Sequence, residues 1–198
     1  MNLGRLNPSN TVLLICDVQE RFRTVIWKFD SVVKTSKLLV DGCSAIGVPV
    51  VCTEQYPKAL GKTVQELTAT PFPIFSKMSF SMTTDDVMKH IKSLPGPEKQ
   101  HFILVGLETH VCVLNTVVDL IGMGKSVHIA VDAVSSSRPT DRAVALKRME
   151  NAGAFMTTAE SALFMLMGSA EFPNFKAVSN LVKEYGKNPS ELPFGSSL

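Results

Sequence analysis

The sequence predicts a three-layer α/β/α sandwich around a mostly parallel six-stranded sheet. Short apolar runs rich in branched residues alternate along the chain with longer segments of helical periodicity. Such alternation is typical of a parallel sheet covered by helices on both faces. The 198 residues suffice for one domain with a sizeable core. We expect this domain to span residues 1–198, with its core at about 11–185 and a fraying tail at 186–198.

Six segments have the composition of strands. The first, residues 11–16, is apolar after Thr11 and ends before an aspartate, as expected of a strand buried on both faces. Pro71 and Pro73 restrict the third segment to the edge of the sheet. The expected strands are residues 11–16, 48–53, 72–75, 101–105, 126–131 and 154–158.

Helices are expected between these strands because apolar residues recur on one face of the intervening segments. Gly47 and Gly153 are suited to end two of the helices, and Thr83 or Thr84 can cap another. Residues 54–67 are polar and predict an exposed loop. The expected helices span residues 31–47, 85–94, 114–121, 139–151, 160–167 and 178–185.

Composition and charge argue against several classes of protein. The chain carries 20 Lys and Arg against 18 Asp and Glu, and its basic residues are scattered, so we expect no nucleic-acid partner. No apolar stretch has the length of a membrane span, so no membrane association is expected. Residues 1–10 are too short and polar for a signal peptide. This favours the cytoplasm, although Arg5 leaves a mitochondrial address open.

Cofactor binding and assembly can also be judged from the sequence. The first strand is followed by Asp17-Val18-Gln19 instead of a GxGxxG motif, so we expect no nicotinamide cofactor, and nothing indicates another cofactor. Hydrophobic residues make up 45% of the chain and charged residues 19%. This apolar surplus favours a homo-oligomer, a dimer or larger.

The four cysteines differ in their surroundings. Cys16, Cys43 and Cys52 fall inside apolar elements and are expected in the core. Cys112 follows a predicted strand and precedes a predicted helix, where backbone N–H groups and the helix dipole lower the pKa of a thiol. Cys112 is therefore either a nucleophile or one more small buried side chain.

Two further residues are placed to assist a nucleophile. Asp17 follows the first strand, at the sheet edge where α/β proteins bind ligands. Lys77 stands in a predicted loop among small and apolar residues. Asp17 could act as a base, Lys77 could stabilise negative charge, and N–H groups near Cys112 could bind an oxyanion. The alternatives are a turn residue at Asp17 and a surface lysine whose stem lies on apolar groups.

Three motifs in this order resemble the isochorismatase-like (cysteine) hydrolase family. They are Asp17-Val18-Gln19, Ser76-Lys77-Met78-Ser79-Phe80 and the Gly-x-x-Thr-x-x-Cys-Val pattern of residues 106–113. Glu54-Gln55-Tyr56-Pro57 and Glu108-Thr109-His110-Val111-Cys112 are most similar to eukaryotic isochorismatase-domain-containing proteins. The resemblance extends from Val12 to about Leu181.

The resemblance implies catalytic roles for Asp17, Lys77 and Cys112. It also implies a non-proline cis peptide bond, which we place between Leu107 and Glu108. The N–H groups of Glu108 and Cys112 are then the expected oxyanion donors.

Departures from related enzymes narrow the expected chemistry. Nicotinamidases of this superfamily hold a metal through an Asp-x-His pair and a further histidine, but residues 53–59 contain no histidine. We expect no metal. Isochorismatases proper tend to lack the cysteine, so Cys112 favours a small amide-like (C–N) substrate and a thioester intermediate. The alternatives are a catalytically weak binding or regulatory protein and a hydrolase that acts on nucleic acid.

The substrate pocket is predicted from aromatic residues near these motifs and from the neighbours of Cys112. Each of the aromatic residues could equally belong to the core. Glu108 could select a cationic or hydrogen-bonding group or be solvated, and His110 could transfer protons or cap the helix. The predicted pocket residues are Phe22, Trp27, Tyr56, Phe80, Leu107 and His110.

Overall fold

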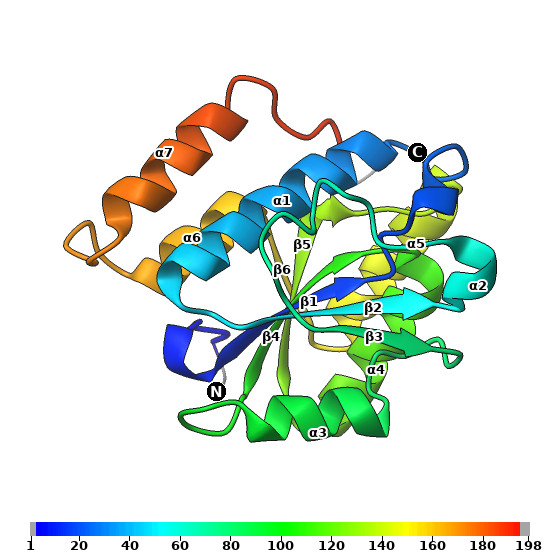
Figure 1. The fold of residues 1–198 in the computed structure, drawn as a ribbon, viewed down its shortest axis with the longest axis horizontal. Helices are drawn as coiled ribbons and strands as arrows, with labels where there is room; N and C mark the ends of the chain where they lie inside the picture. The colour runs from blue at the N-terminus through cyan, green and yellow to red at the C-terminus, as the bar shows by residue number, and fades with distance from the viewer. Residues whose placement is uncertain (1–2, 195–198) are drawn as a thin grey trace.

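Six parallel strands form one sheet between two layers of helices (Figure 1). The computed structural model describes residues 3–194. Neighbouring strands are parallel throughout, in the order β3-β2-β1-β4-β5-β6. The strands are β1 (Thr11–Cys16), β2 (Val50–Gln55), β3 (Ile74–Lys77), β4 (His101–Gly106), β5 (Ser126–Val134) and β6 (Phe155–Thr157). The predicted six-stranded three-layer sandwich is confirmed.

Helices cover both faces of the sheet. One layer contains α1, α6 and α7, and the other contains α3, α4 and α5. Along β1, Leu13 and Ile15 face the first layer, whereas Val12, Leu14 and Cys16 face the second, as the two-residue period of a strand requires. These helices are α1 (Phe29–Ile46), α3 (Asp85–Ser93), α4 (Leu114–Gly122), α5 (Pro139–Asn151), α6 (Ala159–Met167) and α7 (Phe175–Tyr185).

The shorter elements lie mostly at the ends of strands. They are η1 (Pro8–Asn10), η2 (Glu20–Phe22), α2 (Pro57–Leu60) and the π-helical turn η3 (Thr109–Val113). The edge strand β3 begins two residues later than predicted, because Pro73 has no N–H to donate and serves only as an acceptor for the N–H of Cys52. The strand also ends two residues later than predicted, so Lys77, predicted in a loop, is the last residue of β3.

The order of the strands creates a crevice beside β1. From β1 the chain builds β2 and β3 on one side and then crosses to β4 on the other. Ligands bind in parallel α/β sheets at such a reversal, outside the carboxyl ends of the strands. Asp17 follows β1 at this point, and Gly106 ends β4 there.

Gly106 allows β1 and β4 to approach closely at the crevice. It is paired with Cys16 across the two strands and has a φ of +113°. A Cβ atom at Gly106 would lie 2.1 Å from the carbonyl oxygen of Cys16. No side chain larger than hydrogen fits there without moving the backbone.

The C-terminal segment packs on the domain as far as Phe194. Ser190 donates its hydroxyl to the carbonyl of Asp132, and Arg142 donates to the carbonyl of Pro193. Leu192 is buried. Residues 190–193 of the predicted tail therefore contact α5 and the end of β5, and the fraying of the tail stays a prediction. Residues 195–198 lie outside the described residues.

Within residues 3–194, the helices are all too short or too polar to cross a lipid bilayer.

Replacing Gly106 by alanine is expected to destabilise the fold by about 3 kcal/mol or more, since it combines a positive φ with a backbone clash. Urea denaturation measures the change. Gly47→Ala is the matched control, because Gly47 has a φ of +84° but open space around its Cα. Gly47→Ala is expected to lower the free energy of unfolding by only about 1 kcal/mol. An equal decrease in the free energy of unfolding for the two variants would contradict the close approach at Gly106.

Candidate functional site

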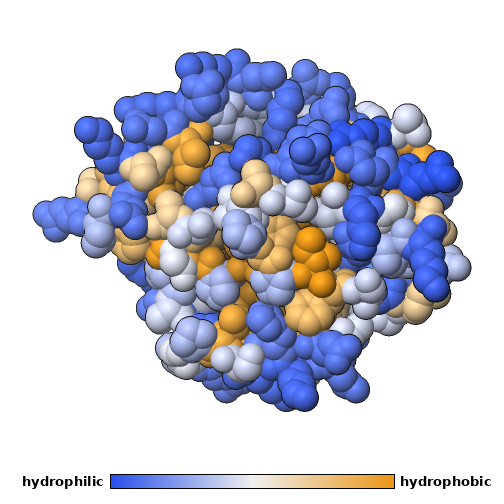
Figure 2. All heavy atoms as spheres, in the orientation of Figure 1, coloured by the Kyte–Doolittle hydropathy of each residue, from blue (hydrophilic) through white to orange (hydrophobic). Residues whose placement is uncertain are grey.

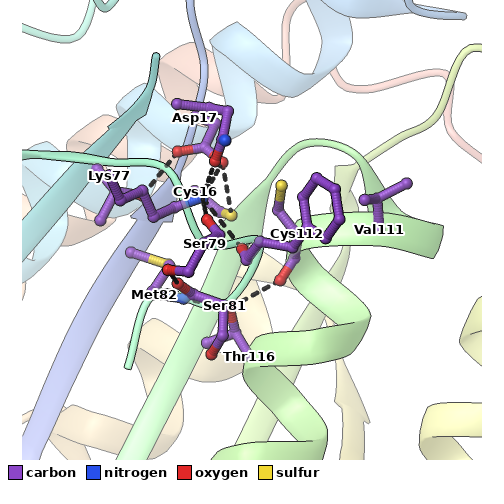
Figure 3. Close-up of polar contacts among 12 residues, drawn as sticks. Cys16, Asp17, Lys77, Ser79, Ser81, Met82, Val111, Cys112 and Thr116 are labelled. Atoms are coloured by element: carbon purple, nitrogen blue, oxygen red, sulfur yellow. Dashed lines mark hydrogen bonds and ion pairs between the residues drawn. The ribbon is translucent and has the colours of Figure 1, made fainter. Parts of the chain in front are cut away.

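The three predicted catalytic residues meet at the carboxyl ends of three different strands. Asp17 follows β1, Lys77 ends β3, and Cys112 lies in η3 after β4. Figure 3 shows their side chains converging on one space. One carboxylate oxygen of Asp17 lies within 4.8 Å of the Cys112 sulfur. All three residues are buried.

Asp17 is held in an unusual backbone conformation. Its φ is +53°, which is rare for a residue other than glycine, asparagine or aspartate. This conformation brings its carboxylate to the same side as the preceding side chain, and the Cys16 sulfur lies 3.6 Å from Oδ2. Thr53 on β2 donates its hydroxyl to Oδ1 at 2.8 Å. The carboxylate is therefore fixed by two neighbouring strands.

Lys77 forms a buried ion pair with Asp17. Its Nζ lies 2.7 Å from Oδ2, and both side chains are almost fully excluded from solvent. Burial by itself would lower the pKa of Lys77, but the negative charge of Asp17 and the hydrogen bond to its carboxylate raise it above its ordinary value. Lys77 is therefore a charged group inside the protein and not a surface lysine.

The remaining contacts of the Lys77 ammonium fix the loop after β3. It donates to Oε1 of Gln55 at 2.7 Å and lies 3.1 and 3.0 Å from the carbonyl oxygens of Ser79 and Phe80. The loop therefore folds back over the ammonium and excludes water from the ion pair. Phe80 reaches the site in this way.

Cys112 lies where the helical segment begins. The turn η3 leads directly into α4, and the Cys112 carbonyl accepts a hydrogen bond from the Thr116 hydroxyl at 2.7 Å. The same hydroxyl accepts the N–H of Met82 at 2.9 Å, so the loop after β3 and α4 are joined behind the cysteine (Figure 3). Cys112 is therefore held in the first turn of a continuous helical segment that spans η3 and α4.

The predicted cis peptide bond is wrong. The bond between Leu107 and Glu108 is trans, as is every peptide bond that the structure describes. The change of direction after β4 occurs instead at Gly106, whose positive φ lets the N–H of Leu107 donate to the carbonyl of Cys16 at 2.8 Å. The N–H groups of Thr109 and Val111 bond to Ser135 and Glu108 carbonyls.

A cavity of about 210 Å³ opens onto Asp17 and Cys112. The predicted residues Phe22, Phe80 and Leu107 line it. Tyr56, Trp27 and His110 do not belong to its lining. Its full lining is Asp17, Phe22, Gln55, Leu60, Phe80, Leu107, Glu108, Val111 and Cys112.

Trp27 and His110 contact the loop after β5 and do not line the cavity. The backbone N–H of Trp27 donates to the Ser136 carbonyl, and the backbone carbonyl of Trp27 accepts a hydrogen bond from the Ser135 hydroxyl. His110 Nδ1 lies 3.0 Å from the Ser136 hydroxyl. Glu108 accepts the N–H of Ser137 at 2.8 Å. One carboxylate oxygen of Glu108 therefore binds the loop after β5, and Glu108 also lines the cavity.

Two glutamines complete the site and were not predicted as site residues. Gln19 donates to the carbonyls of Gln55 and Gly61 at 3.0 and 2.7 Å and accepts the N–H of Gln55 at 2.8 Å. Gln19 thus fixes the backbone from which Gln55 reaches Lys77. The signal was present in the sequence, since Gln19 belongs to the first motif and Gln55 to the Glu-Gln-Tyr-Pro stretch.

Among the described residues, one group of side chains has the donors and spacing for a metal ion. The two sulfurs of Cys16 and Cys112 and a carboxylate oxygen of Asp17 lie within 4.8 Å of one another. The Lys77 ammonium already binds this carboxylate, and its positive charge disfavours a cation there. The absence of a metal cofactor stays a prediction.

This fold and site define a member of the isochorismatase family. The isochorismatase domain family matches residues 11–161, and the chain belongs to it. The chain is 42% identical to "Isochorismatase domain-containing protein 2" of Danio rerio, over 99% of this chain and 98% of the relative.

Two other similar proteins carry different names. "Secreted isochorismatase effector Isc1" of Phytophthora sojae is 42% identical over 99% of this chain and 95% of its own. The structure of the MAR1 ribonuclease from Caenorhabditis elegans superposes with a TM-score of 0.88 at 42% identity, covering 98% of this chain and 100% of the neighbour. The predicted family is confirmed by these similarities.

Removing the charge of Lys77 is expected to be costly because it leaves a buried carboxylate without a partner. Lys77→Met should lower the free energy of unfolding by about 3–5 kcal/mol, and adding Asp17→Asn should restore part of the loss. Thermal and urea unfolding measure both. The control is Lys147→Met, whose ion pair with Glu150 is exposed and whose loss should cost less than about 1 kcal/mol. Similar losses for Lys77→Met and Lys147→Met would count against the buried pair.

Proposed function

We propose that this protein is a metal-independent cysteine hydrolase that cleaves the C–N bond of a small amide-like substrate. The observation that carries the proposal is the meeting of a carboxylate and a cysteine in the wall of one cavity, with an ammonium buried against the carboxylate. A nucleophile, a base and a group that orients the base form the usual requirement for acyl transfer.

In the proposed first step, Cys112 attacks the carbonyl carbon of the substrate. Asp17 accepts the thiol proton, and the two groups approach hydrogen-bond distance when the substrate is bound. The negative charge that develops on the carbonyl oxygen is stabilised by the N–H groups of Glu108 and Cys112. Asp17 then returns the proton to the leaving nitrogen, and the C–N bond breaks to give a thioester.

In the second step water hydrolyses the thioester. Asp17 again acts as the base, accepting a proton from water, and Cys112 leaves as a thiolate. Lys77 stays bound to Asp17 throughout, where its positive charge stabilises the neighbouring anions and keeps the carboxylate in position. Lys77 therefore acts as a charge stabiliser and not as a proton donor.

The cavity limits the substrate to a small molecule. About 210 Å³ is less than the usual volume of a site for a drug-sized ligand. Phe22, Leu60 and Val111 supply apolar walls, and Glu108 supplies one acceptor. We propose a compact, apolar amide that carries one hydrogen-bond donor or a positive charge toward Glu108.

The test uses a panel of small primary amides and an assay for released ammonia. Wild type should release ammonia and accumulate an acyl adduct on Cys112 that mass spectrometry detects after acid quench. Cys112→Ala should lose activity by about 10³-fold or more, whereas Cys43→Ala, which removes a buried thiol of α1, should keep it. Iodoacetamide should alkylate Cys112 first, because burial raises the pKa of Cys43 to about 12.

Two outcomes would refute this function. If Cys112 reacts with iodoacetamide no faster than Cys43, the activated thiolate does not exist. If a ligand binds wild type and Cys112→Ala equally and is never turned over, the protein is a binding or regulatory member of the family.

The similarity to a named ribonuclease favours one second candidate, the hydrolysis of RNA. Against it, Glu108 places a carboxylate in the cavity wall, where it would repel a phosphodiester. Incubating RNA with wild type and with Asp17→Asn tests this candidate. If wild type cleaves the RNA and Asp17→Asn does not, the protein is a ribonuclease and the amide proposal is wrong.

We further propose that the protein functions in the reducing environment of the cytoplasm. All four cysteines are unpaired, which suits a compartment that keeps thiols reduced.

We also propose that the chain forms homo-oligomers through the edge of the sheet at β3. Ile74 and Met78 are 40% and 69% exposed, and Phe80 beside the cavity is 57% exposed. Figure 2 shows apolar side chains gathered in the middle of the face that carries this edge. An uncovered apolar edge strand favours association.

Light scattering is expected to give a dimer or larger species. Met78→Asp should shift it toward monomer, whereas Val144→Asp on α5, with a similar exposure of 63%, should not. A wild-type monomer at micromolar concentration would exclude assembly through β3.

A further inference from the structure

A second cysteine lies beside Cys112 and has no role in the proposed hydrolysis. Cys16 ends β1, and its side chain faces the same helical layer as Cys112. The two sulfur atoms and a carboxylate oxygen of Asp17 lie within 4.8 Å of one another. Figure 3 shows both sulfurs directed into the same space next to Asp17.

The two thiols differ in access. Cys112 lines the cavity and is 7% exposed, whereas Cys16 is 0% exposed and does not line it. A small solute in the cavity can reach the Cys112 sulfur first. The Cys16 sulfur is within reach of Cys112 and of the Asp17 carboxylate, which lies 3.6 Å away.

The surroundings of Cys16 keep it from competing as a nucleophile. Burial, the hydrogen bond with Cys112 and the negative charge of Asp17 raise the pKa of the Cys16 thiol well above its ordinary value. Cys16 therefore remains a protonated thiol beside a reactive one, with a carboxylate next to its proton. This is the arrangement of a resolving cysteine next to a peroxide-sensitive thiol.

We propose that Cys16 and Cys112 form a reversible disulfide when hydrogen peroxide oxidises Cys112. The inference depends on the reactivity of the Cys112 thiol and on its distance from Cys16, but not on which substrate is hydrolysed. Cys16 would serve as the resolving thiol of this modification site.

The chemistry of the proposed modification balances in two steps. Asp17 accepts the thiol proton of Cys112, the thiolate attacks one oxygen of hydrogen peroxide, the O–O bond breaks, and the departing hydroxide takes that proton from Asp17 to become water. Sulfur is oxidised to a sulfenic acid and the peroxide is reduced. Cys16 then gives its proton to Asp17 and attacks the Cys112 sulfur. The S–O bond breaks, and hydroxide leaves with that proton as a second water.

The bond requires only a local movement. A disulfide needs an S–S distance of about 2.05 Å, and the sulfurs start within 4.8 Å. Cys112 lies in a π-helical turn, a helix type that is rare and less regular than an α-helix, so a small shift there can close the gap while β1 stays in the sheet. The disulfide would block hydrolysis and protect Cys112 from irreversible oxidation to a sulfinic acid.

The experiment treats the reduced full-length protein with hydrogen peroxide and follows intact mass and tryptic peptides. Wild type should lose two hydrogen atoms and yield a cross-linked peptide that contains Cys16 and Cys112. Dithiothreitol should reverse the change and restore the alkylation of Cys112 by iodoacetamide to above about 90% of its starting rate.

Matched variants distinguish a disulfide between Cys16 and Cys112 from nonspecific oxidation of the protein. Cys16→Ser and Cys16→Ala should both gain two oxygen atoms at Cys112 and fail to recover with dithiothreitol, whereas Cys43→Ala should behave as wild type. Thermal unfolding checks that each variant is folded. The absence of the cross-linked peptide in wild type, or equal sulfinic acid formation in wild type and the Cys16 variants, would overturn the inference. Because the readout is mass, the result does not depend on whether the amidase proposal holds.

Discussion

The buried ion pair between Lys77 and Asp17 is the interaction on which the rest of the site depends. It joins the edge strand β3 to the central strand β1 across β2. Taking two charges out of water costs several kcal/mol for each ion, and good geometry with further hydrogen bonds is needed to offset it. Thr53, Gln55 and the carbonyls after β3 provide these bonds. The pair therefore organises the neighbouring loops as well as the reactive groups.

The crevice of the sheet explains why residues far apart in the chain meet. Cys112 and Asp17 come from the ends of β4 and β1, which are adjacent strands at the reversal of strand order. Gly106 lets these strands approach until the Leu107 N–H reaches the Cys16 carbonyl. The distance between the carboxylate and the thiol is thus a result of strand pairing. The cavity above them is closed by shorter elements, η2, α2 and the loop after β3, that have little regular structure of their own.

Patterns within single segments predicted most of the fold, because alternating apolar strands and amphipathic helices carry a clear signal. Asp17 and Cys112 could likewise be placed after strands from the sequence, whereas Lys77 was predicted in a loop and ends β3. Features that depend on contacts between segments were missed or wrong. The packing of residues 190–194, the trans bond before Glu108 and the start of β3 depend on partners elsewhere in the chain. Trp27 was predicted in the pocket on its residue type, but its backbone is bonded to the loop after β5.

The position of Lys77 on an edge strand has a consequence for how the protein loses its site on heating. β3 has four residues and pairs with one neighbour, whereas β1 and β4 each pair with two. Edge segments with few partners open locally at a lower free energy than the centre of a sheet. Detachment of β3 would remove the ammonium while leaving the carboxylate and the thiol in a folded core. The arrangement of Asp17, Lys77 and Cys112 therefore depends on β3 staying paired with β2, and we expect heating to disrupt it before the domain unfolds.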